Sequence, residues 1–426
     1  MKYICFFILA SWCTTSKVEA QPITKFQGGK VLTYDAEGKG AFVSQDFYVL
    51  DSVIRFEVTQ PPDTTIDITD RYVIPPFGDA HTHNLDREWQ RAFLPEQYLA
   101  EGTFYVLNLT SKAQEVEKLR PYYDQPNTPD VRFALQGWTS ELGHPFLAYE
   151  PFAMGLNDPS VWQDSMAAIK NSRLDEGNSY LFANTVEEAQ TKMADFFAQQ
   201  PDVVKIYLVD SERYDENSAD TIAGNNGLSK EVAQYITDEA HRHNLPVFAH
   251  ITNGTDFALA TKIGVDCVAH VPTIGWNGED STKSLYVIPD FLMEEAIDQN
   301  IAVITTLQWT YDVDSLRQQR KLALATDFLQ RYHQLGGTIL IGSDRFGETL
   351  VPEIQALITS QVFDPATLLR IVSSTTPRYI FPERNIGQIK DHCEADFLLL
   401  AKDPLENSEA LLHIQEGYKA GKRAGD

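Results

Sequence analysis

Short apolar runs alternate with longer amphipathic stretches through the middle of the chain. Eight such runs occur, at 73–79, 102–109, 131–137, 202–209, 245–250, 265–270, 301–307 and 338–344. Helix-like segments separate them, for example 229–243, which begins with Ser229 and carries the acidic Glu231 in its first turn. Strands that alternate regularly with helices indicate parallel βαβ units, and eight of them predict an α/β protein with a closed (β/α)8 TIM-like barrel. An open doubly wound sheet is the alternative.

Both ends of the chain have a different pattern. Residues 21–72 alternate short β-like runs with Gly and Pro, and an apolar β-like run returns at 395–401. We therefore predict a small β-sandwich domain built from both chain ends, residues 21–72 and 378–426. The barrel is predicted over residues 73–377.

The first twenty residues have the composition of a targeting segment. Lys2 gives a basic start, residues 3–12 are mostly apolar, and the small residue Ala20 ends the segment. This pattern predicts a secretory signal peptide over residues 1–20, and the apolar run is too short for a membrane span. We expect a secreted or periplasmic protein, with a lipid anchor at Cys13 as the alternative, and no stable membrane insertion. Only Cys267 and Cys393 follow this segment, too few for a disulfide framework.

Composition narrows the class of protein. The chain has 426 residues, of which 43% are apolar and 22% charged, so it can bury a large core and is not a disordered polymer. Its formal net charge is −25. Nucleic-acid binding requires clustered Lys and Arg, so this charge argues against a nucleic-acid partner.

Polar residues stand at the ends of the apolar runs, where barrel enzymes carry their reactive groups. These residues are His81, His83, His250, His270 and Asp344. Neutral imidazoles and a carboxylate are the ligands that Zn²⁺ and similar divalent ions prefer, so the pattern predicts a metal site. Lys205 lies inside another run, and a lone ammonium in an apolar barrel is costly unless it is paired or chemically changed.

These residues resemble the signatures of the amidohydrolase superfamily. The segment 73–83, VIPPFGDAHTH, is similar to the metal-binding first strand of that family. The later signatures follow in the family's order around Lys205, His250, His270 and Asp344. The sequence after Pro377, with ADFLLL at 395–400, is similar to the family's return to a small β domain. The spacing most resembles the imidazolonepropionase and prolidase-like branch.

The resemblance implies a role for each of these side chains. His81 and His83 would bind a buried metal ion with Asp344 beside it, and His250 and His270 would bind a second, more exposed ion. Lys205 would be carboxylated and would bridge the two divalent ions. Zn²⁺ is the first expectation, with Mn²⁺, Ni²⁺ and iron as alternatives. Asp344 would also be the catalytic residue that accepts a proton from the attacking water.

The resemblance further implies hydrolysis of a C–N amide bond by a metal-activated water. The expected substrate is a small peptide, as for a prolidase or dipeptidase, or a cyclic amide. His144, Tyr207 and Arg345 are the candidate substrate-binding residues, and Trp138, Trp276 and Trp309 are candidates for the pocket wall, with core packing as the alternative. A lactonase or other ester hydrolase, a deaminase and a non-catalytic binding protein are the alternative functions. The substrate, the native metal and a homo-oligomeric state are left open.

Overall fold

The computed structural model describes residues 22–35, 38–220, 223–310 and 314–425. The predicted signal peptide, including Cys13, lies outside these described residues.

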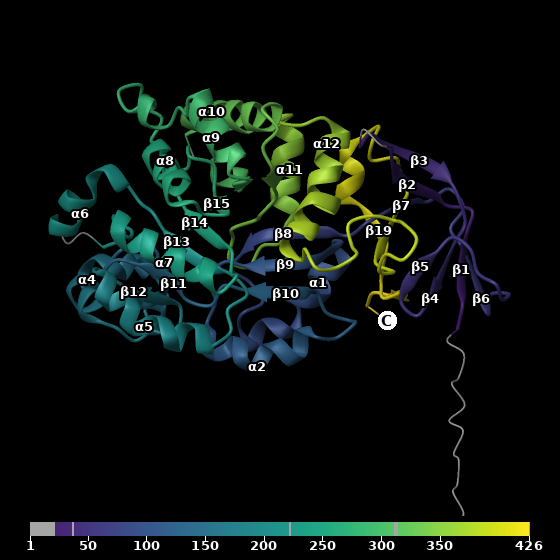
Figure 1. Cartoon of the computed structure of the whole chain (residues 1–426), viewed down its shortest axis with the longest axis horizontal. Coiled ribbons are helices and arrows are strands. Elements are labelled where there is room, and N and C mark those ends of the chain that lie inside the picture. The colour runs from purple at the N-terminus through teal and green to yellow at the C-terminus, as the bar shows by residue number, and fades with distance from the viewer. Residues whose placement is uncertain (1–21, 36–37, 221–222, 311–313, 426) are drawn as a thin grey trace, which may run out of the picture.

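A ring of parallel strands forms the centre of the molecule (Figure 1). The strands, in order around the ring, are β8 (Phe77–Thr82), β9 (Thr103–Asn108), a third position split into β10 (Asp130–Phe133) and β11 (Gly137–Thr139), β13 (Val204–Tyr207), β14 (Val247–His250), β15 (Cys267–Ala269), β16 (Ala302–Ile304) and β17 (Ile339–Leu340). Each of the eight predicted apolar runs overlaps one of these positions. An additional short strand, β12 (Tyr180–Phe182), pairs with the free edge of β11.

The last strand position returns to the first and closes the barrel. The Ala80 N–H donates to the carbonyl of Ile341 at 2.8 Å, and the Asp344 N–H donates to the carbonyl of His81 at 2.6 Å. We call this contact, residues 79–81 against 341–344, the β8–β17 seam. The barrel prediction is therefore confirmed, and the alternative of an open sheet is wrong.

Helices cover the outside of the barrel between successive strands (Figure 1). They include α2 (Ala113–Tyr123), α5 (Val186–Ala198), α7 (Lys230–Arg242), α8 (Gly254–Ile263), α9 (Asp290–Asp298), α10 (Ser315–Gln334), α11 (Val351–Ser360) and α12 (Pro365–Arg370), with a π-helix (Ile371–Thr375) leading into α13 (Thr376–Ile380). The shorter helices α1 (Leu94–Ala100), α3 (Phe146–Ala153), α4 (Trp162–Asn171) and α6 (Tyr214–Asp220) lie in the connections.

Helix α7 shows why these segments fold and pack as they do. The Ser229 hydroxyl caps the helix by accepting a hydrogen bond from the Val232 N–H at 3.3 Å. Val232, Ile236 and Ala240 recur at helical spacing and are buried in the same apolar cluster as the barrel strands. The helix expected at 229–243 is thus confirmed.

Strands from both chain ends form two further sheets. One sheet has the order β5 (Val53–Arg55), β4 (Phe47–Leu50), β1 (Thr24–Gln27) and β6 (Thr64–Asp67). The other has the order β20 (Lys422–Arg423), β19 (Ile414–Lys419), β18 (Phe397–Leu400), β7 (Tyr72–Ile74), β2 (Lys30–Tyr34) and β3 (Gly40–Ser44). Phe26, Phe47, Phe397 and Tyr418 pack together in one buried cluster that draws on both sheets. The division of the chain at residues 72 and 378 stays a prediction.

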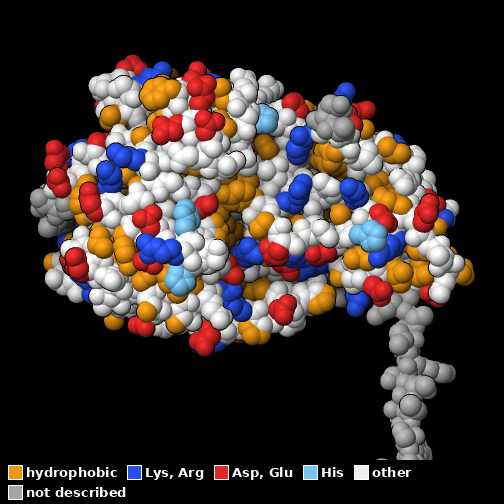
Figure 2. All heavy atoms as spheres, viewed as in Figure 1, with side chains coloured by type: hydrophobic (Ala, Val, Ile, Leu, Met, Phe, Trp, Pro, Cys, Tyr) orange, Lys and Arg blue, Asp and Glu red, His pale blue; other side chains and the backbone are white. Residues whose placement is uncertain are grey.

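The surface, the cysteines and the helices add three observations. Acidic and basic side chains are interspersed over the face seen in Figure 2. Cys267 and Cys393 are both free and buried. Within the part of the chain that the structure describes, no helix has the length and apolar character needed to cross a bilayer.

Candidate metal centre and cavity

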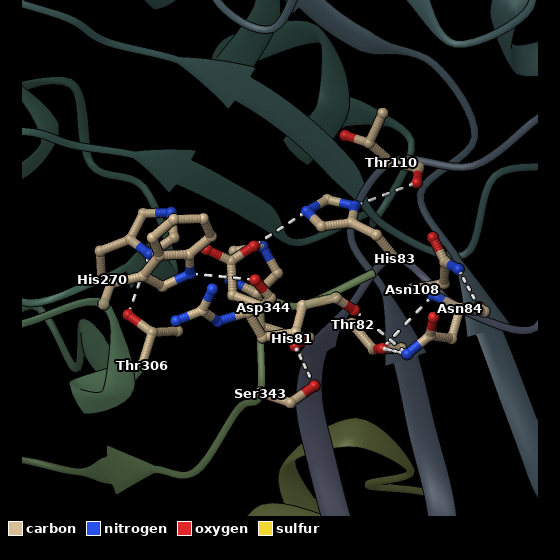
Figure 3. Close-up of polar contacts among 12 residues, drawn as sticks. His81, Thr82, His83, Asn84, Asn108, Thr110, His270, Thr306, Ser343 and Asp344 are labelled. Atoms are coloured by element: carbon tan, nitrogen blue, oxygen red, sulfur yellow. Dashed lines mark hydrogen bonds and ion pairs between the residues drawn. The ribbon is translucent and has the colours of Figure 1, made fainter. Parts of the chain in front are cut away.

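The first barrel strand and the loop after the last one meet at Asp344 (Figure 3). His81 lies within β8, and His83 follows this strand directly. The Nε2 atoms of His81 and His83 lie 3.0 Å and 2.9 Å from the same carboxylate oxygen, Oδ1 of Asp344. Three predicted ligands therefore converge although the sequence separates His83 and Asp344 by 261 positions.

His270 approaches the same carboxylate from the other side of the barrel. Its Nδ1 lies 3.5 Å from Oδ2 of Asp344 and 2.9 Å from the hydroxyl of Thr306. The metal-binding atoms of His81, His270 and Asp344 all lie within 4.8 Å of one another. His270 and Asp344 have φ angles of 86° and 48°, which non-glycine residues rarely adopt. Such backbone conformations are typical of side chains that the surrounding structure holds in position for function.

His250 and His144 extend the imidazole cluster. His250 ends β14, and its ring centroid lies 4.6 Å from that of His270. His144, in the loop after β11, stacks on His250 with the centroids 4.5 Å apart. Tyr207 lies beside both rings, and its hydroxyl is 2.7 Å from the hydroxyl of Thr110. The structure therefore places both His144 and Tyr207 next to the predicted ligands.

Lys205 lies on β13 with its ammonium inside the barrel. The side chain is fully buried, and its Nζ has no hydrogen-bond partner among the described residues. Burial is the main reason that the pKa of Lys205 falls to about 7, although the charge of Asp344 opposes this shift. A buried cation without a partner is expensive, so this position favours a neutral or chemically modified amine.

Burial also keeps four of the imidazoles, those of His81, His144, His250 and His270, neutral. It lowers the pKa of His81 and of His144 to about 4, and lowers the pKa of His250 and His270 well below the ordinary value. Neutral imidazole is the form that binds a metal ion. The donor set fits divalent metal ions. Imidazoles converge on the Asp344 carboxylate, and the Nζ of Lys205 beside them has no hydrogen-bond partner among the described residues. The assignment of each ligand to one ion stays a prediction.

Asp79 holds the β8–β17 seam directly beneath the ligands. It is fully buried, and its Oδ1 accepts hydrogen bonds from the N–H groups of His81 and Ser343, at 3.1 Å and 3.0 Å. Its Oδ2 accepts from the Ser343 hydroxyl at 2.7 Å. Asp79 therefore links His81, a predicted metal ligand, to Ser343, the residue directly before the predicted ligand Asp344.

A cavity of about 340 Å³ opens above these side chains. The described residues that line it include all six predicted metal ligands together with His144, Tyr207, Trp309, Tyr149 and Phe346. Its volume is within the range of small-molecule sites.

Three of the residues proposed from the sequence lie elsewhere. Arg345 is not among the residues lining the cavity, since its guanidinium lies over the ring of Trp309 at 4.2 Å and donates to the Gln308 carbonyl. Trp138 is fully buried and packs edge-on against Phe196, and Trp276 donates its indole N–H to the Glu279 carbonyl. Trp138 and Trp276 therefore pack inside the protein, which was the alternative expectation, whereas Trp309 lines the cavity.

Sequence reasoning missed two wall residues, Tyr149 and Phe346. Tyr149 lies on α3, a helix in the long connection after β11, and nothing in the strand pattern marks it. Phe346 could have been predicted from the sequence, because it follows Asp344 by two residues in a loop at the carboxyl end of a barrel strand.

Comparison with known proteins supports the fold. No family model matches the chain. An ochratoxinase of Aspergillus niger is 25% identical over 212 residues, which cover 46% of this chain and 42% of that protein. The chain thus matches less than half of the length of this curated relative.

Solved structures match over nearly the whole chain. The crystal structure of A. niger ochratoxinase has a TM-score of 0.71 and 17% identity, with 96% of this chain and 97% of that chain covered. A prolidase in complex with N-methylphosphonate-L-proline has a TM-score of 0.69 and 16% identity, over 94% and 99% of the two chains. Phenylurea hydrolase B has a TM-score of 0.68 and 15% identity, over 95% and 97%. At these identities the likeness shows a shared fold.

Replacement of Asp79 tests the seam. Asp79→Ala removes the acceptor from the buried N–H groups of His81 and Ser343, and each unsatisfied group should lower the free energy of unfolding by about 1–3 kcal/mol. Metal affinity should fall as well, because His81 and Asp344 lose their common anchor. Asp79→Asn retains one acceptor oxygen and should show a smaller effect on both quantities. Urea unfolding and a metal-chelator competition measure them.

A buried carboxylate outside the site gives the control. Asp396 accepts hydrogen bonds from the Ala420 N–H and the Tyr105 hydroxyl, both at 2.7 Å. Asp396→Ala should lower stability without lowering metal affinity. If Asp79→Ala and Asp396→Ala affected metal affinity equally, Asp79 would have only a general structural role.

Proposed function

We propose that this chain is a metal-dependent hydrolase of amide C–N bonds in small molecules. Its barrel fold and its candidate ligands fit the amidohydrolase superfamily. The observation that carries the proposal is the convergence of four histidines, a buried lysine and Asp344 at the carboxyl ends of barrel strands. The names of the similar proteins, a prolidase, an ochratoxinase and a phenylurea hydrolase, support a hydrolase.

Two divalent ions would be held by these side chains. His81, His83 and Asp344 would hold one, His250 and His270 the other, and a carboxylated Lys205 would lie between them. Bound there, the ions would lower the pKa of a coordinated water toward neutrality and polarise the substrate carbonyl. Zn²⁺ is our first choice for this donor set, with Mn²⁺, Ni²⁺ and iron as alternatives. Carboxylation would turn the cation of Lys205 into an anion, and the burial of its Nζ without a hydrogen-bond partner among the described residues supports this assignment.

The chain's own groups would supply proton transfer and orientation. Burial alone would raise the pKa of Asp344, but the facing imidazoles of His81 and His270 and the hydrogen bonds from His81 and His83 hold it well below its ordinary value. Its carboxylate is thus ionised and able to accept a proton from the attacking water and pass it to the leaving amine. The Tyr207 hydroxyl, oriented by Thr110, could donate a hydrogen bond to the substrate carbonyl.

Amide hydrolysis is favoured over deamination by Asn253. This residue follows β14, where some deaminases of the superfamily carry an acid. Its side chain caps α8 by accepting from the N–H groups of Thr255 and Asp256 and donates to Asp210 at 3.0 Å. The Asn253 side chain therefore has a structural role, and it does not supply the acid that a deaminase would carry there. Ester or lactone hydrolysis uses the same groups, and a substrate panel separates the two.

The location and the domain division are also part of this proposal. The basic and apolar start of the sequence supports export to the periplasm or the exterior, with cleavage before Gln21. If N-terminal sequencing of protein from its native host gave a chain that began at Met1, this result would contradict export.

We further propose that the two sheets made from the chain ends form a small β-sandwich domain, which the shared Phe26, Phe47 and Phe397 cluster supports.

Asp344→Asn tests the reaction. The amide can still bind a metal through its oxygen but cannot accept a proton, so kcat should fall roughly 10²–10⁴-fold. The measurement is hydrolysis of a panel of aryl amides, dipeptides, cyclic amides and lactones by metal-loaded protein. Glu348→Gln, an exposed change in the same loop, is the matched control and should keep its activity. Near wild-type kcat in Asp344→Asn would remove this residue from the proton-transfer role.

Lys205→Ala tests the bridge. The variant should lose metal and activity together and leave a space about as large as a short carboxylic acid. Millimolar acetate or propionate, added with metal, should restore part of both by supplying the missing carboxylate. Lys419→Ala is the control, because Lys419 is a buried lysine whose Nζ is paired with Asp130 at 2.6 Å. A fully active, metal-loaded Lys205→Ala without added acid would show that Lys205 does not bridge the ions.

A further inference from the structure

Three aromatic side chains line the cavity, and we call them together the aromatic wall. Tyr149 comes from α3, Trp309 from the short helix η5 (Leu307–Thr310), and Phe346 from the loop after β17. Phe346 is 52% exposed and Trp309 39% exposed, although both are large and apolar. Exposed aromatic residues that gather at the mouth of a cavity indicate a surface that a ligand covers.

Contacts with the predicted ligands hold this wall in place. Phe346 stacks on the His83 ring with the centroids 5.1 Å apart and the planes at 21°, and it meets Tyr149 edge-on at 6.0 Å. The Trp309 indole N–H donates to the Asp344 carbonyl at 2.9 Å. The aromatic wall therefore lies directly beside the reacting centre, and the rest of the lining adds the apolar side chains of Ala148, Val209 and Ile274.

Cationic side chains are scarce around this cavity. Among the described residues that line it there is no arginine, and Lys205, fully buried beside the metal ligands, is the one lysine. The guanidinium of Arg345 is held over Trp309 and donates to Gln308. Lys112, near the Tyr149 ring at 5.5 Å, donates to Asp175 at 2.5 Å. A substrate carboxylate placed against the wall would lose its hydration without gaining a cationic side chain as a partner among the described lining residues.

We propose that the site is built for uncharged amides that carry an aromatic or bulky apolar group, and that it discriminates against a free carboxylate such as that of a dipeptide. This inference rests on the proposed hydrolase function. In the reaction the C–N bond breaks, water supplies the oxygen that bonds to the acyl carbon, and its protons go to the new carboxyl group and the released amine. The aromatic wall binds the apolar group while the carbonyl faces the metal ligands.

A matched pair of substrates tests this specificity. N-benzoylphenethylamine and N-benzoylphenylalanine differ only in a carboxylate next to the scissile nitrogen. For the metal-loaded enzyme we expect kcat/KM to be at least about tenfold higher for the uncharged compound, the size of difference that one unpaired charge readily produces. A higher value for N-benzoylphenylalanine would overturn the inference and leave the hydrolase function standing.

Binding separates failure of the inference from failure of the function. If neither compound is hydrolysed and the wider panel is also inert, the proposed function is wrong. Titration calorimetry of the same two compounds against the metal-loaded protein then decides the preference. Tighter binding of the uncharged compound would support the inference about the cavity, and equal or weaker binding would overturn it.

Variants at Phe346 locate the preference in the wall. Phe346→Ala should raise KM for N-benzoylphenethylamine about tenfold with little change in kcat, as for loss of one aromatic contact, and Phe346→Leu should raise it less. Phe346→Arg should shift the preference toward N-benzoylphenylalanine. Phe291→Ala, at an aromatic residue of α9 that is 68% exposed and outside the cavity, is the control. An unchanged KM in Phe346→Ala, or no shift in Phe346→Arg, would contradict the role of the wall.

Discussion

The seam between β8 and β17 is the contact on which the site depends. A barrel closes only if its last strand pairs with its first, and here that pairing places Asp344 opposite His81 through a main-chain hydrogen bond of 2.6 Å. Asp79 reinforces the seam from below with bonds to both strands. Because the ligands sit on rigid strand ends, their side chains meet without any adjustment of distant loops.

Buried charge is the second constraint. Lys205 and Asp344 are both buried in the barrel, and burial lowers the pKa of His81, His250 and His270 around them, which keeps these imidazoles neutral. Such an arrangement is costly for a protein that only needs a stable core, because apolar residues would pack the same space at lower cost. In the function that we propose, two divalent ions with a carboxylated lysine would balance these groups.

Most of the fold and the ligand cluster could be predicted from the sequence, for a physical reason. Barrel strands that are buried on both faces have continuous apolar sequences, so each of the eight apolar runs predicts a strand. A polar residue at the end of such a run is therefore easy to identify as a candidate for function. His81, His250 and Asp344 were visible in this way. The split of the third strand into β10 and β11 was not, because both pieces belong to one apolar stretch.

Loop side chains escaped prediction because their direction depends on tertiary contacts. Arg345 follows Asp344 directly and was expected to bind substrate, but its guanidinium lies over the ring of Trp309 and Arg345 is not among the residues that line the cavity. Tyr149 and Phe346, from segments about two hundred residues apart, meet only in the folded protein. The substrate preference that we propose therefore rests on contacts seen only in the structure, whereas the cluster of candidate ligands was already indicated by the strand pattern.

We propose that this cluster holds a binuclear metal centre. Elemental analysis of wild-type protein, purified without chelator and equilibrated with Zn²⁺ before removal of free metal, tests it most directly. The account predicts two ions per chain. One ion per chain at full activity, or none, would contradict it.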